Sequence, residues 1–216
     1  VLELARLGGE QRVNVAKVAH THPIAIAQSG GVIGVSGHVV HEQHRAAHED
    51  QPGTGCVSLA HFDLLRKSGV TKATYVILTH GHGDHYGGVG YLRRRYAPAV
   101  HMGAPDWEMT ATQLEFDRPD WGRPPVRNPA TDLALKDGDR LRLGDTAIDI
   151  LMTPGHTMGT VSLLFSARQG SQVHRTLLWG GTSFNFGRQP NRMERLQAYI
   201  DATARVRDVA RAQNVD

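Results

Sequence analysis

The chain has 216 residues, of which 40% are hydrophobic and 21% are charged, values typical of a globular protein with one sizeable core and not of a disordered chain. Lys and Arg number 24 against 21 for Asp and Glu, and a formal net charge of +3 is too small to indicate nucleic-acid binding by itself. No apolar run is long enough to span a bilayer. Cys56 is the only cysteine, which excludes a disulfide within the chain.

The two ends of the sequence carry little functional signal. The chain begins with Val1, and no charged segment followed by an apolar one marks a signal peptide, so we expect such a peptide to be absent or already removed. The chain ends at Asp216 directly after a helical pattern, from which we expect a fragment of a longer protein.

Residues 1–57 have the weakest secondary-structure signal. Small, apolar and Gly residues between Pro23 and Val40 predict short strands with Gly-rich turns. Four histidines then follow at spacings of three and four residues, which would place them on one face of a helix: His38, His41, His44 and His48. A solvated polar stretch is the favoured interpretation of these histidines, and metal binding is the alternative.

From residue 58 to about residue 114, helical and strand patterns alternate. Leu59, Phe62 and Leu65 share a helical face, and Gly69 can end that helix. The elements expected next are a buried strand at Thr74–Thr79, a helix around Val89–Tyr96, a strand at Ala99–Met102 and a helix from Pro105 to about Leu114.

The remaining sequence predicts one long loop, four strands and a final helix. Residues 117–131 hold four Pro and no periodicity, and loops of this length are often functional. The strands are expected at Asp139–Leu143 and Thr146–Met152, which form a hairpin around Gly144-Asp145, and at Thr160–Phe165 and Val173–Trp179. The helix is expected at Arg192–Ala212, with an apolar face made by Met193, Leu196, Ile200 and Ala204. Strands, hairpins and helices intermixed in this way predict a layered α/β sandwich.

The clearest functional signal is the segment His80–His85, which reads His-Gly-His-Gly-Asp-His and directly follows a predicted strand. On an extended segment His80 and His82 point to the same side, because side chains alternate along a strand. The intervening glycines let the loop approach an ion, and zinc favours imidazole nitrogen and carboxylate oxygen as ligands. Asp84 and His85 lie further along the loop and can serve a second ion. A solvent-facing polar loop is the alternative interpretation.

A second candidate segment is Thr153–Thr160, which reads Thr-Pro-Gly-His-Thr-Met-Gly-Thr and also follows a predicted strand. Alone it indicates a surface turn. Together with the first segment it predicts that His156 is the third ligand of the ion held by His80 and His82. Three protein ligands with an open fourth position are typical of a catalytic zinc site.

The two segments, in this order and about 70 residues apart, resemble the motifs of the metallo-beta-lactamase superfamily over residues 58–215 or so. The resemblance implies an α/β fold, a four-layer αβ/βα sandwich with the metal site at one edge of its two sheets. It implies that His80, His82 and His156 hold one zinc ion and that Asp84 and His85 contribute to a second. Zinc lowers the pKa of bound water to about 7 and so supplies hydroxide to attack a carbonyl. The implied catalytic role of Asp84 is to orient that hydroxide and pass a proton to the leaving group.

The sequence departs from the usual superfamily pattern in two places. Many members have a bridging Asp after the strand that follows the third-ligand loop, whereas the equivalent stretch here, Leu178–Phe184, holds no carboxylate. In this it resembles the zinc beta-lactamase subclass without a bridging Asp or Cys, whose sixth ligand is a late His that would lie beyond Asp216. We therefore expect a fold incomplete at its C-terminus. The usual hairpin and apolar run ending in Asp-Thr-Gly are not found in residues 1–57, which we expect to be a divergent N-terminal segment of the same domain as residues 58–216.

Other polar and aromatic residues have weaker signals. Thr182 and Ser183 are candidate substrate-binding hydroxyls, with ordinary loop residues as the alternative. Three aromatic residues are candidates for lining a substrate pocket, because apolar walls are usual around small-molecule sites: Trp107, Trp121 and Phe184. Core packing or loop anchoring is the alternative role for each of them. The arginines of the final helix predict a solvated face rather than a nucleic-acid surface, because no aromatic residues alternate with them; they are Arg192, Arg195, Arg205, Arg207 and Arg211.

The sequence thus predicts a zinc-dependent hydrolase of a small-molecule substrate, with one or two Zn²⁺ ions per chain and beta-lactam hydrolysis as the first reaction to test. Hydrolysis of a lactone, thioester, phosphodiester or sulfate ester is the alternative within the superfamily. The alternative that is not an enzyme is a non-catalytic metal-binding or remnant domain. We expect neither a nucleic acid nor a membrane as a partner. By resemblance the expected location is the bacterial periplasm or the exterior, and no feature predicts an oligomeric state.

Overall fold

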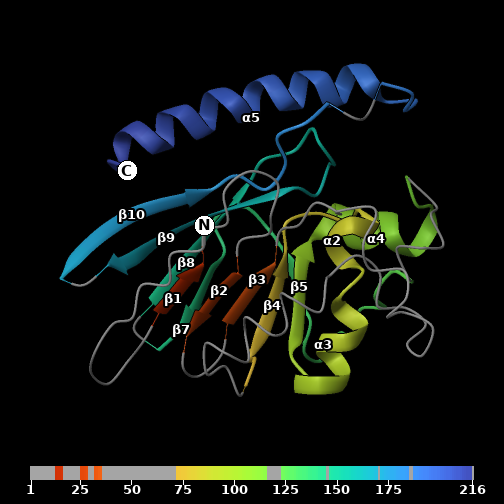
Figure 1. Ribbon diagram of the computed structural model, residues 1–216. Coiled ribbons are helices and arrows are strands. Elements are labelled where there is room, and N and C mark those ends of the chain that lie inside the picture. The colour runs from red at the N-terminus through yellow and green to blue at the C-terminus, as the bar shows by residue number, and fades with distance from the viewer. Residues whose placement is uncertain are drawn as a thin grey trace, which may run out of the picture. The chain divides into compact units, whose positions relative to one another are not determined.

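The first sheet has six strands in the order β1-β2-β3-β4-β5-β6 (Figure 1). Strands β1 (Val13–Ala16), β2 (Ala25–Gln28) and β3 (Val32–Val35) pair antiparallel. Strands β3, β4 (Tyr75–Leu78), β5 (Ala99–Gly103) and β6 (Ala134–Leu135) pair in parallel. All four residues of β4 are buried, as is usual for a parallel strand covered on both faces. The strands expected between Pro23 and Val40 and at residues 74–79 and 99–102 are therefore confirmed.

This computed structural model describes residues 13–16, 25–28, 32–35, 72–115, 123–144, 146–169, 171–184 and 187–215. Side chains are described for residues 72–115, 123–144, 146–167, 171–184 and 187–215. Several predictions lie outside these residues: the histidine-rich stretch from His38 to His48, the helix expected around Leu59–Leu65, and the role of Trp121. Residues 123–133, the described part of the predicted long loop, contain neither helix nor strand.

The second sheet has four antiparallel strands in the order β10-β9-β8-β7. They are β7 (Arg140–Leu143), β8 (Thr146–Met152), β9 (Val161–Gln169) and β10 (Gln172–Leu178). The predicted hairpin is confirmed, with Leu143 opposite Thr146 and Gly144 supplying the positive φ of +58° that a tight turn requires. A second hairpin joins β9 to β10. Strand β9 runs four residues past its predicted end, and the prediction stopped short because Ser166–Gln169 lacks the apolar pattern of a strand.

Four helices lie within the described residues: α2 (Gly83–Tyr86), α3 (Val89–Tyr96), α4 (Ala104–Thr112) and α5 (Arg192–Ala212). The predicted bounds of α3 and α5 are confirmed, and α4 ends two residues earlier than expected. The short helix α2 replaces part of the irregular loop expected after β4. Over the described part of the chain, no helix has both the length and the apolar composition that crossing a bilayer demands.

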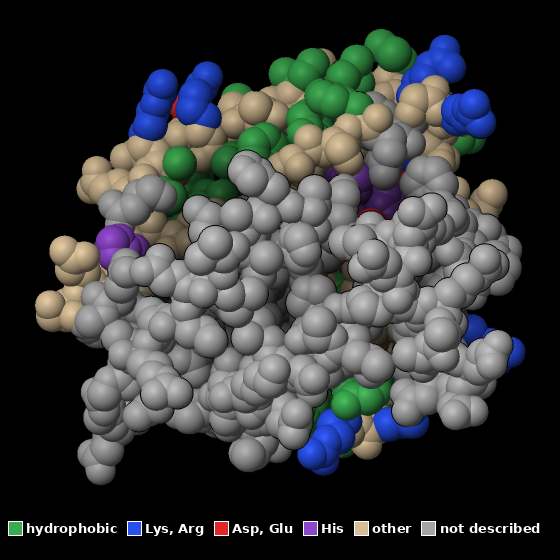
Figure 2. All heavy atoms as spheres, viewed as in Figure 1, with side chains coloured by type: hydrophobic (Ala, Val, Ile, Leu, Met, Phe, Trp, Pro, Cys, Tyr) green, Lys and Arg blue, Asp and Glu red, His purple; other side chains and the backbone are tan. Residues whose placement is uncertain are grey.

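Helix α5 buries a different face from the one predicted. Met193 and Ile200 are 68% and 52% exposed, and Figure 2 shows hydrophobic side chains gathered over this helix. The buried positions, spaced as one helical face, are Arg195, Tyr199, Ala202 and Val206. The predicted apolar face and the predicted solvation of Arg195 are therefore wrong, because a buried arginine with hydrogen-bond partners occupies the inner side of the helix.

The chain divides into two compact units. The first comprises Val1–Leu78, His82–His101 and Phe116–Leu133, and the second Thr79–Gly81, Met102–Glu115 and Ala134–Asp216. In the first unit the buried carboxylate of Asp132 accepts hydrogen bonds from the backbone N–H groups of Val100 and Asn128, both at 2.8 Å, and pairs with Arg93 at 2.5 Å. In the second unit the core includes Ile148 and Ile150 of β8 and the five consecutive buried residues Val161–Phe165 of β9.

Candidate metal centre

The loop that follows β4 carries three buried histidines. His80, His82 and His85 are only 2%, 4% and 6% exposed, so the alternative of a solvent-facing polar loop is wrong. Helix α2 begins at once after His82, whose carbonyl accepts hydrogen bonds from the N–H groups of His85 and Tyr86 at 2.9 and 3.0 Å. Buried polar rings need hydrogen-bond or metal partners for their nitrogens, so the partners of these rings indicate the role of the loop.

His80 meets His156, which lies on the loop between β8 and β9. The Nε2 atoms of the two rings are 3.0 Å apart, and the ring planes cross at 82°. The other nitrogen of each ring faces a backbone carbonyl. His80 Nδ1 lies 3.0 Å from the carbonyl oxygen of Gly180, and His156 Nδ1 lies 2.8 Å from that of Ser183.

These contacts fix the tautomers of both rings. A carbonyl oxygen can only accept a hydrogen bond, so each Nδ1 must carry the proton and donate it. With each Nδ1 turned to a carbonyl, the Nε2 atoms of the two rings face one another at 3.0 Å. A cation between the rings would find two imidazole nitrogens aimed at it. Anchoring Nδ1–H on a carbonyl is also the usual way in which proteins orient a histidine that binds zinc through Nε2. The donor set therefore fits zinc.

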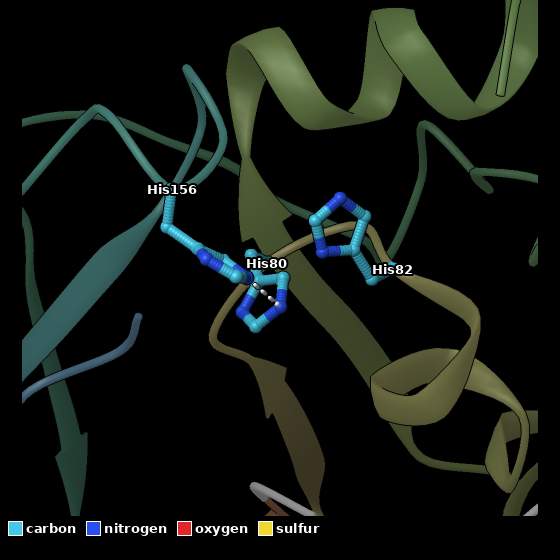
Figure 3. A group of neighbouring side chains, drawn as sticks. All are labelled: His80, His82 and His156. Carbon is cyan, nitrogen blue, oxygen red and sulfur yellow. Dashed lines mark hydrogen bonds between the residues drawn. The ribbon is translucent and has the colours of Figure 1, made fainter. Parts of the chain in front are cut away.

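The structure brings all five predicted ligands together in two groups. Ligand atoms of His80, His82 and His156 all lie within 4.8 Å of one another (Figure 3). Ligand atoms of His80, Asp84 and His85 do the same, and His85 Nε2 lies 3.7 Å from a carboxylate oxygen of Asp84. His80 belongs to both groups, so a change at this residue bears on both.

Two consecutive glycines after β10 pack against the two rings of the His80–His156 pair. Gly180 supplies the carbonyl that holds His80, and a Cβ at this position would lie 1.9 Å from the carbonyl oxygen of Val161. A Cβ at Gly181 would lie 2.7 Å from the Cβ of His156. Neither position has room for a side chain. At these two positions of the stretch, the absence of a carboxylate thus has a steric reason.

The candidate substrate contacts differ in their surroundings. Thr182 and Ser183 are exposed, and Ser183 Oγ lies 3.4 Å from His156 Nδ1. Phe184 is also exposed and packs on Tyr199 with ring centroids 4.4 Å apart. Trp107 is buried within the second unit, as expected if core packing is its role. A substrate role for Thr182, Ser183 and Trp107 stays a prediction.

Two buried charged residues next to the metal-binding loops were not predicted from the sequence. Arg195 of α5 donates to the carbonyl oxygens of Gly155 and His156 and to the carboxylate of Glu115. Asp106 of α4 accepts from backbone N–H groups of the same loops. The helical spacing of Arg195 with Tyr199, Ala202 and Val206 was the only local signal of its burial.

These observations define a mixed α/β protein with a histidine-rich metal centre on the loops that follow β4 and β8. A family model described as the metallo-beta-lactamase superfamily matches residues 52–169, more than half of the chain. The chain therefore belongs to the metallo-beta-lactamase superfamily, a superfamily of metal-dependent hydrolases, as its two motifs predicted.

Curated relatives share about a third of their residues with this chain over the matched segment. The hydroxyacylglutathione hydrolase of Cereibacter sphaeroides is 35% identical over 95 residues, which cover 44% of this chain and 30% of that protein. The hydroxyacylglutathione hydrolase of Rhodopseudomonas palustris is 32% identical over 116 residues, which cover 54% of this chain and 36% of that protein. The matches thus span about a third of the length of these relatives.

Solved structures confirm the fold class. A subclass B3 metallo-beta-lactamase of Bradyrhizobium japonicum superposes with a TM-score of 0.65 at 21% identity, covering 92% of this chain and 74% of that one. The metallo-beta-lactamase GOB-18 of Elizabethkingia meningoseptica gives a TM-score of 0.61 at 18% identity, covering 95% and 73%. At these identities the likeness shows the metallo-beta-lactamase fold alone.

Proposed function

We propose that this chain is a zinc-dependent hydrolase that opens the cyclic amide of beta-lactams. The observation that carries the proposal of a metal centre is the pair of Nε2 atoms of His80 and His156, which lie 3.0 Å apart on rings anchored on the carbonyls of Gly180 and Ser183. Because the anchors fix both rings before an ion arrives, little side-chain freedom is lost on binding.

The choice of beta-lactams rests on the stretch after β10. Gly181 leaves no space for a carboxylate beside His156. This agrees with the resemblance to the zinc beta-lactamase subclass that lacks a bridging Asp or Cys. Several structural neighbours are named as subclass B3 metallo-beta-lactamases, which makes beta-lactams the first substrates to test.

Each proposed site residue has a defined task. Zinc, when bound, polarises the carbonyl under attack and makes water a stronger nucleophile. The Nε2 atoms of His80 and His156, together with His82, hold the ion. Asp84 is partly exposed and lies 3.7 Å from His85 Nε2, and its proposed task is to orient the attacking water. The same carboxylate would accept a proton from that water and pass it to the amide nitrogen as the ring opens.

Thioester hydrolysis is the second candidate. Its support is that curated relatives above 30% identity are named hydroxyacylglutathione hydrolases. A thioester and a beta-lactam both offer an activated carbonyl. The thiolate of a thioester can leave without a proton, and the amide nitrogen of a beta-lactam takes up one proton as the ring opens. The same centre therefore suits either substrate, and the residues that contact the rest of the substrate decide between them.

The test is a substrate comparison on the zinc-loaded 216-residue chain. A chromogenic cephalosporin and a hydroxyacylglutathione thioester are assayed in parallel, with His80→Ala as the control for contaminating enzymes. Cephalosporin turnover that disappears in His80→Ala would support the first candidate, and thioester turnover alone would support the second. A folded, zinc-loaded chain that hydrolyses neither compound would rule out both candidates and leave lactone, phosphodiester or sulfate-ester hydrolysis and the non-catalytic metal-binding remnant.

A further inference from the structure

Asp106 is a buried carboxylate in the first turn of α4. It is 1% exposed, whereas an isolated charge in the protein interior is costly and needs strong hydrogen-bond donors around it. Three donors meet it. Gly81 N–H and the hydroxyl of Thr157 donate to Oδ2 at 2.6 and 2.7 Å, and Gly159 N–H donates to Oδ1 at 2.8 Å.

The positions of these donors in the sequence are informative. Gly81 lies between the proposed ligands His80 and His82, at the centre of the first loop. Thr157 and Gly159 follow His156 directly, in the second loop. One carboxylate therefore bonds to two loops that are 76 residues apart in the chain, as measured between His80 and His156.

The approach of Asp106 to both loops depends on glycine. A Cβ at Gly159 would lie 2.5 Å from the Cγ of Asp106. A Cβ at Gly81 would lie 3.2 Å from the Cβ of Asp106 and 2.8 Å from Cε of Met109. At Gly159 only a bare backbone lets the N–H group reach the carboxylate, whereas at Gly81 an added methyl group would press on Asp106 and displace the flexible end of Met109.

We propose that Asp106 is a positioning residue of the metal centre, one that sets the separation of the His80 and His156 loops through Gly81, Thr157 and Gly159. The inference rests on the metal centre under Proposed function and adds a residue that bonds to the loops of the ligands through Gly81, Thr157 and Gly159. Residues that orient ligands from behind commonly change metal affinity by about tenfold to a hundredfold when they are replaced.

Asp106→Asn is the informative change. The amide keeps the shape of the carboxylate but exchanges one acceptor oxygen for an N–H₂ donor. If its oxygen stays with Gly81 and Thr157, its N–H₂ group faces Gly159 N–H, and one of the two loops loses its bond. The folded chain then holds His80 and His156 at a less defined separation.

Asp132→Asn is a matched control in the first unit. Asp132 is also a buried carboxylate that accepts from two backbone N–H groups, those of Val100 and Asn128. None of its described partners is within two residues of a proposed ligand. Loss of general stability should therefore appear in both variants, and loss of zinc affinity only in Asp106→Asn.

The experiment measures the zinc affinity of the 216-residue chain and both variants by competition with a chromophoric chelator, and the free energy of unfolding of each metal-free protein. We expect Asp106→Asn to bind Zn²⁺ about tenfold to a hundredfold more weakly than the unchanged chain, and Asp132→Asn to bind it as tightly as the unchanged chain. Equal zinc affinity in Asp106→Asn, or an equal loss in Asp132→Asn, would overturn the positioning role.

A second variant serves if Asp106→Asn does not fold. Thr157→Val removes one donor to Asp106 and keeps the size of the side chain, and we expect a smaller weakening of zinc binding. Unchanged affinity in Thr157→Val would then count against the inference. A folded, unchanged chain that binds no Zn²⁺ at all would refute the metal centre itself, an outcome distinct from tight binding that ignores Asp106.

Discussion

A Cβ at Gly155 would lie 2.5 Å from the Cβ of Tyr199, so the loop that carries His156 rests on the backbone of helix α5 with no side chain between them. Gly155 has a φ of +134°, a conformation that residues with a side chain rarely adopt. Its carbonyl accepts a hydrogen bond from Arg195 Nε at 3.1 Å. Helix α5 therefore helps to set the place of His156.

Gly155→Ala should consequently disturb both stability and metal binding. The added methyl group meets Tyr199, and we expect the free energy of unfolding to fall by about 2–4 kcal/mol and zinc affinity to fall with it. Gly138→Ala is the control, because Gly138 has a φ of +79° but nothing within 4 Å of an added Cβ. It should cost only about 1–2 kcal/mol of backbone strain and leave zinc binding unchanged. Urea denaturation and chelator competition measure the two quantities, and equal effects of the two substitutions would contradict this account.

Arg195→Met should be strongly destabilising. Arg195 is 1% exposed and bonds Glu115 at 2.7 Å as well as the carbonyls of Gly155 and His156. Removal of one partner of a buried ion pair leaves the other charge without compensation and costs about 3–5 kcal/mol. We expect Glu115→Gln, added to Arg195→Met, to restore part of that loss in urea denaturation. A double variant no more stable than Arg195→Met alone would show that the carbonyl contacts, not the ion pair, dominate.

His80→Ala should remove more zinc than His85→Ala. His80 contributes to both ligand groups, whereas His85 contributes to the group with Asp84 alone. We expect elemental analysis to find one or two zinc ions in the unchanged chain, close to none in His80→Ala, and one in His85→Ala. His174→Ala is the control, since His174 on β10 is in neither group and its loss should leave the zinc content unchanged. Full zinc retention in His80→Ala would contradict the assigned centre.

Acid sensitivity of the second sheet should depend on Asp149. The hydrogen bond from Arg140 on the neighbouring strand outweighs desolvation and, with Arg175, holds the pKa of Asp149 below its ordinary 3.8. A carboxyl whose pKa is lower in the folded than in the unfolded state adds stability above the unfolded value, and that stability is lost as the pH falls through the folded value. The advantage of the unchanged, metal-free chain over Asp149→Asn should therefore shrink below about pH 4. Unfolding measured from pH 6 to pH 2 tests this, and a difference that does not change with pH would contradict it.

The parts of the fold and site that the sequence predicted depend on local patterns. The apolar run of β4, the hairpin around Gly144 and the segment His80–His85 are each defined within about ten residues. His156 required the pairing of two separate segments, and the resemblance to a known superfamily supplied it. The family match confirms that resemblance, and the side chains of the two segments lie close together, while their role as metal ligands stays a prediction.

The parts that were not predicted depend on partners far along the chain. Arg195 reads as a solvated arginine until its bonds to Gly155, 40 residues away, and to Glu115, 80 residues away, are known. Asp106 reads as an acidic residue in a first helical turn, a common position for one, because its partners lie 25 to 53 residues away. A buried charge is recognised by its surroundings, which a single sequence does not display.

Gly181 also limits how this protein can evolve. One base change converts a glycine codon into an aspartate or a glutamate codon, so mutation alone gives ready access to a carboxylate at this position. The obstacle is the side chain of His156: its Cβ would lie 2.7 Å from the Cβ of any residue that replaced Gly181. A lineage that gained the carboxylate would first have to shift the loop of an existing ligand, at the expense of the centre already in use. Steric exclusion, rather than the supply of mutations, is therefore the barrier to a carboxylate at Gly181.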